Sequence, residues 1–580
     1  MNKQKFRVCA LGNSLVRFEA NMFENVTVVW MNRRRCLGYG ILSPNDNAEE
    51  MIKNKFAYGI ASTKRFSEIA FNVDQCKDFS TDRYGGPGVG FNGGSGRCGI
   101  TEGFQIKGIG TTPLVGSCPP DQIWHNGGEL NLVDGVLEVI NSEILGSILP
   151  YGTVRSLALM RIDDSWDPRT GNYFGLLVRE LCVRPAHFLY AANFTFTDEY
   201  VTQYCKDSDR VRSAFEELNK VHGGTSSVIN LIGDFLRNCA AQFAFSRAHR
   251  LQHGVLSPSN ISISGQWLDL ANVSFVNSGI NFSSGEGQVP FYLEPDAILN
   301  YAHRLCLIYS RNIGIDLNFG PLENYFHEAF DYYLRIFTLD ALGLSKKLIR
   351  APCASEALEN IFREFNELLM KNAETIRFAC PISLESADAV IDYIDKMYHG
   401  CSIARDASPE LEYFSTLARL SYDLDGISVK YPSFIVGRAI IALKKALFSA
   451  SLCSGRLKGA LSVSIRENCD RYLNKLIRQH IKAFSWIFQG SKNSRITMID
   501  FNGIEVVFDE TKHIYTVSRR GKNIALFSRA HDLYDWVKSE LIQECSVFGF
   551  DFFPGIQEML RALSSIENNM SPSNEIPDSP

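Results

Sequence analysis

An amide and a carboxylate, Asn260 and Asp269, stand nine positions apart in a stretch that begins at His253 and reads His-Gly-Val-Leu-Ser-Pro-Ser-Asn-Ile-Ser-Ile-Ser-Gly-Gln-Trp-Leu-Asp. The apolar, helix-like pattern of residues 228–252 ends here, because the residue before a proline is pushed towards extended backbone. Apolar residues on both sides of Gly265 predict a short strand pair that turns at this glycine. We therefore expect the two polar side chains at the two ends of one small hairpin.

These two side chains offer the oxygen ligands that magnesium prefers, and magnesium takes few protein ligands because it keeps several waters. A kinase-type catalytic loop presents an amide and a carboxylate to a phosphate-bound magnesium ion in this way. Asn260 and Asp269 are therefore our candidate metal ligands. The alternative is a surface hairpin with an asparagine cap.

A lysine, Lys107, ends the alternating pattern Phe-Gln-Ile-Lys and precedes Gly-Ile-Gly-Thr-Thr-Pro. This pattern indicates a strand that ends in glycines, and a lysine there can reach phosphate as a point charge. Residues 132–149 then show helical apolar spacing and carry Glu138 and Glu143. A glutamate on such a helix can hold the strand lysine, as in kinases. Glu138 and Glu143 are the candidates for this role, with a solvated helix face as the alternative, which we favour for Glu143. For Lys107 the alternative is a strand-end surface lysine.

Glycine makes up eight of the sixteen residues from Tyr84 to Gly99. Glycine lets backbone N–H groups approach a phosphate closely and adopts positive φ without strain. The alternative is a flexible loop, since a glycine-rich stretch is weak evidence when it stands alone.

These separated blocks together resemble the SelO (YdiU) family, with gaps, from about residue 84 to about residue 310. The family's catalytic segment reads His-Gly-Val-Met-Asn-Thr-Asp-Asn-Met-Ser-Ile-x-Gly, followed by Asp-Tyr-Gly, and its lysine motif reads Leu-Gln-Leu-Lys-Gly-x-Gly-x-Thr-Pro. The resemblance implies a protein-kinase-like fold and the transfer of AMP, rather than phosphate, from ATP to proteins. ATP and Mg²⁺ are the cofactors that it implies.

The resemblance carries roles onto matching positions. The implied residues are the nucleotide-contacting Gly94, Gly96, Arg97 and Gly128, the phosphate-binding Lys107 and Arg184, the lysine partner Glu138, and the metal-binding Asn260 and Asp269. The chain also departs from the family. Ser95 and Gly127 replace family aspartates, and no arginine occupies the place of the second phosphate-binding arginine, where Leu189 or Tyr190 falls. Arg179 is a candidate substitute for it.

The main departure is Ser259, which stands where the family has the aspartate presumed to act as base. A serine does not accept a hydroxyl proton usefully at neutral pH. An acceptor that is already ionised, such as a carboxylate, would need no base. AMP transfer to a peptide C-terminus would then activate it for ligation, a step that maturation enzymes of siderophore-carrying microcins perform. The alternatives are a pseudokinase scaffold that binds nucleotide without turnover and a pure interaction subunit.

The length of 580 residues accommodates two lobes and an appendage. We expect an α+β, protein-kinase-like two-lobed fold. Residues 1–195 would form the N-terminal lobe with the Gly-rich loop and the phosphate lysine, and residues 196–490 the helical C-terminal lobe with the metal loop. Residues 491–560 would form a small β-rich accessory module, and residues 561–580 a disordered tail.

The accessory module is predicted from a change of pattern at Ser494. Four short strands separated by turn signals are expected at 495–501, 504–508, 513–517 and 523–527, followed by a helix at 532–541. Such a β-meander with a helix is unlike the SelO core. We interpret residues 495–545 as a module that binds a partner subunit or substrate and is separable from the rest; the alternative is a structural cap.

Composition limits the partners and the compartment. The net charge is −5 and no long basic run occurs, which argues against nucleic acid. The sequence contains no run of eighteen apolar residues, so we expect no membrane span. The apolar run at 6–16 is too short and too interrupted for a secretory signal. The fifteen cysteines are scattered without a Cys-x-x-Cys pair. They indicate reduced thiols and therefore a cytoplasmic protein. A protein or peptide acceptor as partner is what the resemblance implies.

Overall fold

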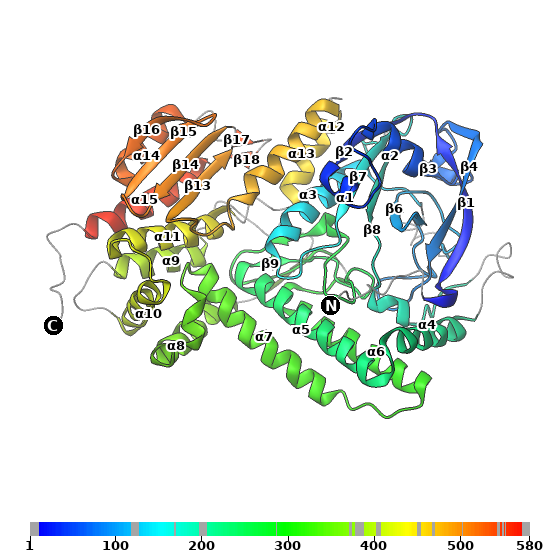
Figure 1. Cartoon of the computed structure of the whole chain (residues 1–580), viewed down its shortest axis with the longest axis horizontal. Coiled ribbons are helices and arrows are strands. Elements are labelled where there is room, and N and C mark those ends of the chain that lie inside the picture. The colour runs from blue at the N-terminus through cyan, green and yellow to red at the C-terminus, as the bar shows by residue number, and fades with distance from the viewer. Residues whose placement is uncertain are drawn as a thin grey trace.

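The computed structural model describes most of the chain (Figure 1). The described residues are 11–117, 127–167, 170–195, 206–285, 287–370, 374–377, 388–401, 408–448, 454–466, 470–501, 503–541, 546–547, 550–551 and 553–570. Within them the protein is of the α+β class, with one large antiparallel sheet and many helices. Among these residues, none of the helices combines the length and the apolar character needed to cross a membrane.

An eight-stranded sheet organises the N-terminal part. Its strands, in spatial order, are β2 (Val26–Met31), β7 (Ser156–Ile162), β8 (Gly175–Glu180), β6 (Phe104–Lys107), β5 (Cys98–Thr101), β4 (Phe71–Asp82), β1 (Leu15–Phe23) and β3 (Tyr58–Gly59). All neighbouring strands are antiparallel. The central position of β6 places its last residue, Lys107, between Cys98 of β5 and Leu177 of β8.

Helices cover both faces of this sheet. Side chains of β7 and β8 alternate, so Met160 and Val178 pack with α1 (Arg33–Gly38) and α2 (Ala48–Phe56). Leu159 and Leu177 face the opposite side and join the core that contains α3 (Leu132–Ile148). The lysine at the end of β6 therefore lies next to a buried helix, as the sequence predicted.

The rest of the chain is mostly helical. The helices are α4 (Asp207–His222), α5 (Thr225–His249), α6 (Glu294–Ile313), α7 (Gly320–Ala341), α8 (Ser355–Met370), α9 (Ala389–Gly400), α10 (Pro409–Asp425), α11 (Tyr431–Phe448), α12 (Ser454–Arg466) and α13 (Asp470–Ser485). Short strands between them are β9 (Leu251–Gln252), β10 (Ser274–Phe275), β11 (Ile280–Ser283) and β12 (Glu374–Arg377). Helices α12 and α13 return to pack on α3.

The hairpin that carries Asn260 and Asp269 is present, but it has one antiparallel bridge, Ile261 to Trp267, instead of two strands. Its outer edges pair elsewhere, because Trp267 also bridges Thr153 and the N–H of Ile263 donates to the carbonyl of Val183 at 2.8 Å. These pairings lie just outside the neighbouring strands, because β7 begins at Ser156 and β8 ends at Glu180.

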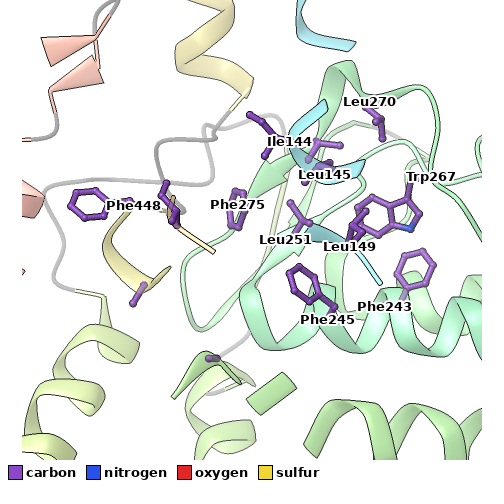
Figure 2. Close-up of a cluster of buried hydrophobic side chains, with 14 of the residues drawn as sticks. Ile144, Leu145, Leu149, Phe243, Phe245, Leu251, Trp267, Leu270, Phe275 and Phe448 are labelled. Carbon is purple, nitrogen blue, oxygen red and sulfur yellow. The ribbon is translucent and has the colours of Figure 1, made fainter. Parts of the chain in front are cut away.

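One apolar core joins the hairpin to the helices on each side of it. Figure 2 shows Trp267 with Phe243 of α5 and with Leu145 and Leu149 near the end of α3. Trp267 is fully buried, and its ring lies 5.3 Å from that of Phe243. The hairpin is therefore fixed to both α3 and α5.

The C-terminal module follows the predicted pattern closely. The four strands are β13 (Arg495–Phe501), β14 (Ile504–Asp509), β15 (Ile514–Arg519) and β16 (Lys522–Phe527), followed by α14 (Ala530–Glu540). The elements β17 (Ser546–Val547), β18 (Phe550–Asp551) and α15 (Phe553–Asn569) come next. Figure 1 shows this module at the end of the molecule opposite the large sheet.

Two expectations about the C-terminal region need correction. The prediction of a disordered tail from residue 561 is wrong for 561–569, which belong to α15; residues 571–580 lie outside the described part. The Glu567 carboxylate accepts hydrogen bonds from the Tyr515 hydroxyl at 2.5 Å and the Ala530 N–H at 2.7 Å. The module also shares one hydrophobic core with α11, which favours the structural cap over a separable unit.

Candidate functional site

Lys107 is the centre of a buried ionic cluster. Its side chain is 3% exposed, and Nζ contacts both Glu138 Oε1 and Asp269 Oδ1. The predicted contact between Lys107 and Glu138 is confirmed, and the carboxylate of Asp269 joins it. The three residues come from β6, from α3 and from the end of the hairpin, so the fold brings together positions far apart in the sequence.

Helix α3 positions two of the polar groups. It begins after Asn131, whose side chain accepts the N–H of Val133 at 3.0 Å and so caps the helix. Glu138 faces Lys107, and Asn141, about one turn later, donates to the carbonyl of Leu270 at 2.8 Å. The helix therefore holds the lysine and also the backbone beside Asp269. The sequence pattern did not reveal this role of Asn141.

Glu143 lies on the same helix but outside the cluster. Its carboxylate is 3.3 Å from Arg155 Nη2 and 3.6 Å from Arg35 Nε, and its side chain is 13% exposed. The interpretation of Glu143 as part of a solvated face was therefore wrong. The choice of Glu138 over Glu143 as the lysine partner was right.

Asp269 has a backbone conformation that is uncommon for a non-glycine residue. Its φ of 63° lies in the left-handed region, where a non-glycine residue costs about 1–2 kcal/mol. Such conformations persist where surrounding contacts impose them, and they are common at functional sites. Here the neighbouring contacts are the Leu268 N–H to the Asn260 carbonyl at 3.2 Å and the bond from Asn141 to Leu270.

Opposing effects set the pKa of each carboxyl in the cluster. Burial raises the pKa of Glu138 despite the attraction of Lys107. Burial also acts to raise the pKa of Asp269, but Lys107, Arg97 and Arg179 outweigh it and hold that pKa well below its usual range. Asp269 is thus ionised at neutral pH, and its side chain is 28% exposed.

Asn260 is oriented by its amide nitrogen, which donates to the carbonyl of Val255 at 2.8 Å. Among the described residues, its amide oxygen receives only a long contact of 3.5 Å from Ser259 Oγ. The loop before it is held by Glu294, whose carboxyl oxygens accept the N–H groups of His253 at 3.2 Å and Gly254 at 3.1 Å. Glu294 lies 41 residues from His253, and sequence reasoning missed it.

The serine at the position of the family base has only neutral partners. Ser259 Oγ lies 2.9 Å from Ser257 Oγ, and no carboxylate or imidazole among the described residues hydrogen-bonds to either hydroxyl. The glycine-rich stretch covers this pair closely, because a Cβ on Gly88 would lie 2.9 Å from Ser257 Cβ. The hydroxyls are therefore enclosed but not activated.

Close packing of the chain is sufficient to explain two of the glycines for which a nucleotide contact was predicted. A Cβ on Gly94 would lie 2.2 Å from the Asp82 carbonyl oxygen, and one on Gly128 would lie 2.2 Å from the backbone of Gly110. Gly96 is less tightly enclosed, with Val115 Cγ2 at 3.0 Å. Gly94 and Gly128 are thus required by chain packing whether or not they contact a ligand.

Arg97 lies at the edge of the ionic cluster. Its guanidinium donates to the Glu129 carbonyl at 3.4 Å. Burial opposes its charge, but the carboxylates of Asp269 and Glu138 raise its pKa above the usual value. Arg97 therefore adds a cation near Asp269. Its predicted contact with a nucleotide stays a prediction.

Two more arginines complete the site. Arg179 Nη1 lies 3.3 Å from Glu138 Oε2, so this residue points into the cluster. Arg184 is 3% exposed and donates to the Ser259 carbonyl at 3.1 Å. Both also donate to Gln105, at 2.8 Å and 3.0 Å. Gln105 was missed in the sequence, where it is an ordinary strand residue.

The metal interpretation rests on two oxygen ligands. Within the described residues, no group of three or more His, Cys, Asp and Glu side chains is arranged to hold a metal ion. Asn260 and Asp269 supply one amide oxygen and one carboxylate. This set fits magnesium bound together with substrate phosphates, and it does not fit a structural zinc ion.

The chain matches no protein-family model and no curated protein.

Proposed function

We propose that the protein binds ATP with Mg²⁺ and transfers AMP to a protein or peptide acceptor, and that its sheet and helices form a kinase-like, SelO-like pair of lobes. The observation that carries the proposal is the contact of Lys107 with both Glu138 and Asp269, three residues that also stand at the matching positions of the motifs. A strand lysine paired with a helix glutamate and set beside a metal-binding aspartate is the arrangement that kinase-like enzymes use.

The charges of the cluster suit a polyphosphate. Lys107, Arg97, Arg179 and Arg184 supply four cations, whereas the neighbouring carboxylates are Glu138 and Asp269, which contact Lys107, and the buried Asp82, which acts on Arg184. Buried cations without matching anions are costly, and an anionic ligand would neutralise them. Arginine and lysine are also the usual partners of phosphate oxygens.

Magnesium fits at Asn260 and Asp269. Asn260 presents its amide oxygen because its nitrogen is held by Val255, and Asp269 is ionised at neutral pH. When bound, the ion would neutralise charge on the phosphates. The protein's own contribution is to fix these two oxygens at the ends of a hairpin anchored to α3 and α5.

A carboxylate is the acceptor that Ser259 favours. The enclosed pair of Ser257 and Ser259 contains no base to take a proton from a hydroxyl acceptor. A carboxylate is already ionised at neutral pH, with an ordinary pKa of about 4. Its oxygen would bond to the α-phosphorus of ATP while the bond to the bridging oxygen of the β-phosphate breaks, which gives an acyl adenylate and pyrophosphate. Such activation would suit peptide ligation, as in the maturation of siderophore-carrying microcins.

The same pair of serines also favours a second candidate, a scaffold that binds nucleotide without turnover. Both candidates keep Lys107, Asn260 and Asp269, and they differ only in whether a reaction follows binding. An interaction subunit with a decayed pocket is less favoured, because decay would not preserve the contacts of Lys107.

Hydroxylamine trapping separates these functions. The full chain is incubated with ATP, Mg²⁺, hydroxylamine and peptides that carry a free C-terminal carboxylate. The proposal predicts a peptide hydroxamate and AMP, both lost with Asp269→Ala and with peptide amides. Stable AMP on Ser, Thr or Tyr would refute the carboxylate acceptor. ATP that raises the thermal midpoint but is never consumed would favour the scaffold.

A further inference from the structure

The four-stranded sheet of the C-terminal module has two edge strands with different surroundings. In Figure 1 the edge strand β13 lies towards the centre of the molecule and the other edge strand, β16, towards its periphery. Helices α11 and α13 pack against β13. The buried Lys444 of α11 donates to the carbonyl of Thr497 at 2.9 Å, so a backbone group of β13 also has a partner within the chain.

The β16 edge is open in comparison. Within the described residues, β16 pairs with β15 alone. Two large apolar side chains of this strand are exposed, Ile524 at 47% and Leu526 at 64%. An edge strand presents a row of backbone N–H and C=O groups that can pair with another chain. Exposed apolar side chains beside such a row favour the addition of a further strand.

The strand is nevertheless anchored from its inner side. Phe527 is opposite Tyr515 of β15, and its ring lies 5.9 Å from the ring of Trp536 in α14. Ala525 and Phe527 pack against the main hydrophobic core, whereas the exposed Leu526 stands between them. The edge is therefore formed before any partner binds, which lowers the cost of binding.

The usual devices against edge pairing act only at the start of β16. Bulges, lysines and prolines commonly protect an edge strand. Here the lysine is the first residue of the strand, Lys522, and the register shift opposite Val517 and Ser518 comes before Ala525. The last part of the strand contains no proline and keeps regular pairing with β15.

Basic residues stand at both ends of this edge. Arg520 and Lys522 are exposed at its beginning, and Arg529 is exposed just after its end. Antiparallel pairing with β16 of a second copy would bring Lys522 of one chain near Arg529 of the other, and like charges across two strands are unfavourable. A strand with acidic residues at its ends and apolar residues between them is the complementary partner.

The chain's own C-terminal tail is a poorer occupant. Residues 571–580 include Pro572, Pro577 and Pro580. Proline lacks the N–H that pairing in a sheet requires.

We propose that the β16 edge binds an extended segment of a partner protein as a fifth strand of the sheet. Ile524 and Leu526 would contact alternate apolar side chains of that segment. Lys522 and Arg529 would contact acidic residues near its two ends. The module can at the same time be part of the main core, because its open edge faces outwards. The proposal does not depend on nucleotide binding or AMP transfer.

The test begins with a displayed library of short random peptides selected on the full chain. We expect enriched peptides to have alternating apolar residues and Asp or Glu near both ends. The most enriched peptide is then synthesised with a fluorophore and titrated with the protein. A copy of this peptide with methylated backbone nitrogens at alternate positions should bind at least about tenfold more weakly, because it keeps every side chain but loses edge hydrogen bonds.

Substitutions at the edge should weaken the binding of the unmodified peptide. We expect a loss of at least about tenfold with Leu526→Lys and at least about threefold with Lys522→Glu. Both side chains are exposed, so the thermal midpoints should equal that of wild type. The matched control is Val463→Lys, which changes an apolar residue that is 54% exposed on α12, and this variant should bind the peptide as wild type does.

Several results would overturn the proposal. These are a selection that enriches no peptide, enriched peptides without acidic residues, and equal binding by wild type and Leu526→Lys. A concentration-dependent dimer of the wild type that Leu526→Lys abolishes would instead assign the edge to a second copy of the chain. Peptide binding that occurs only after removal of residues 571–580 would assign the edge to the tail, and both findings would refute a partner protein as the occupant.

Discussion

Replacing Lys107 with methionine tests the cluster most severely, because the new side chain has similar length and no charge. Glu138 would keep Arg179 at 3.3 Å, and Asp269 would lose its only direct cation among the described residues. The site would thus contain two carboxylates close together with less positive charge. We expect both folding stability and turnover to fall.

The magnitude follows from burial. Removing one partner of a fully buried ion pair costs about 3–5 kcal/mol. The free energy of unfolding of Lys107→Met should fall by about 3 kcal/mol, because Arg179 still holds Glu138 and Asp269 is 28% exposed. Turnover should drop at least about tenfold, which corresponds to about 1.4 kcal/mol in the barrier.

The pH dependence of this effect has a definite sign. In the folded wild type the pKa of Asp269 is depressed, so its contribution to stability is present above the unfolded pKa of about 3.9 and is lost as pH falls through the folded value. Lys107→Met removes a main cause of that depression. The difference in the free energy of unfolding between wild type and Lys107→Met should therefore be largest near neutral pH and should become smaller as the pH falls.

A double-mutant cycle with Glu138→Gln provides the assay, with thermal midpoints measured with and without ATP and Mg²⁺. Glu138→Gln in the Lys107→Met background removes the excess negative charge and should restore part of the lost stability. The expected interaction free energy is about 1–3 kcal/mol. Additive effects, or a Lys107→Met protein with the stability and turnover of wild type, would refute the assignment.

Three further outcomes are expected. Asp269→Ala should abolish magnesium-dependent nucleotide binding in calorimetry, and binding equal to that of wild type would remove Asp269 from the metal site. Burial raises the pKa of Glu294 to about 8 despite the N–H groups of His253 and Gly254. Its contribution to stability is therefore complete below its unfolded pKa of about 4.3 and lost as pH rises through the folded value. The thermal midpoint of Glu294→Gln should therefore decrease less than that of wild type between about pH 5 and pH 9. The same dependence on pH in both proteins would show that the carboxyl of Glu294 is ionised over this whole range. Deleting residues 495–545 should leave an insoluble remainder, because β13 and α11 share one core; a soluble remainder that binds nucleotide would instead restore the separable module.

Local patterns predicted the elements well where neighbours in the sequence decide them. The strands of the C-terminal meander were placed by alternation and by turn residues such as Gly503 and Gly521, both of which have positive φ. The helix bearing Glu138 was placed by its apolar spacing. In contrast, the tail was mistaken for disorder because the contacts of Glu567 come from β15 and α14, which a local pattern does not show.

The site was predictable where motif residues carry the charge and was not where ordinary residues act through space. Lys107 and Asp269 were found because strand-end and hairpin positions are recognisable. The role of Gln105 depends on hydrogen bonds from Arg179 of β8 and from Arg184 in the loop after β8, which no local pattern in the sequence shows. Glu294 likewise acts across 41 positions on His253, and no local signal marks it.

The fate of labelled ATP tests the central claim of AMP transfer most directly. The full chain is mixed with Mg²⁺, peptides carrying a free C-terminus, and ATP labelled at either the α- or the γ-phosphate. AMP transfer predicts that the α-label appears on the peptide or as AMP while the γ-label leaves as pyrophosphate, and that Lys107→Met and Asp269→Ala abolish both. Transfer of the γ-label to the peptide would make the protein a kinase and contradict the account, as would intact ATP with every peptide.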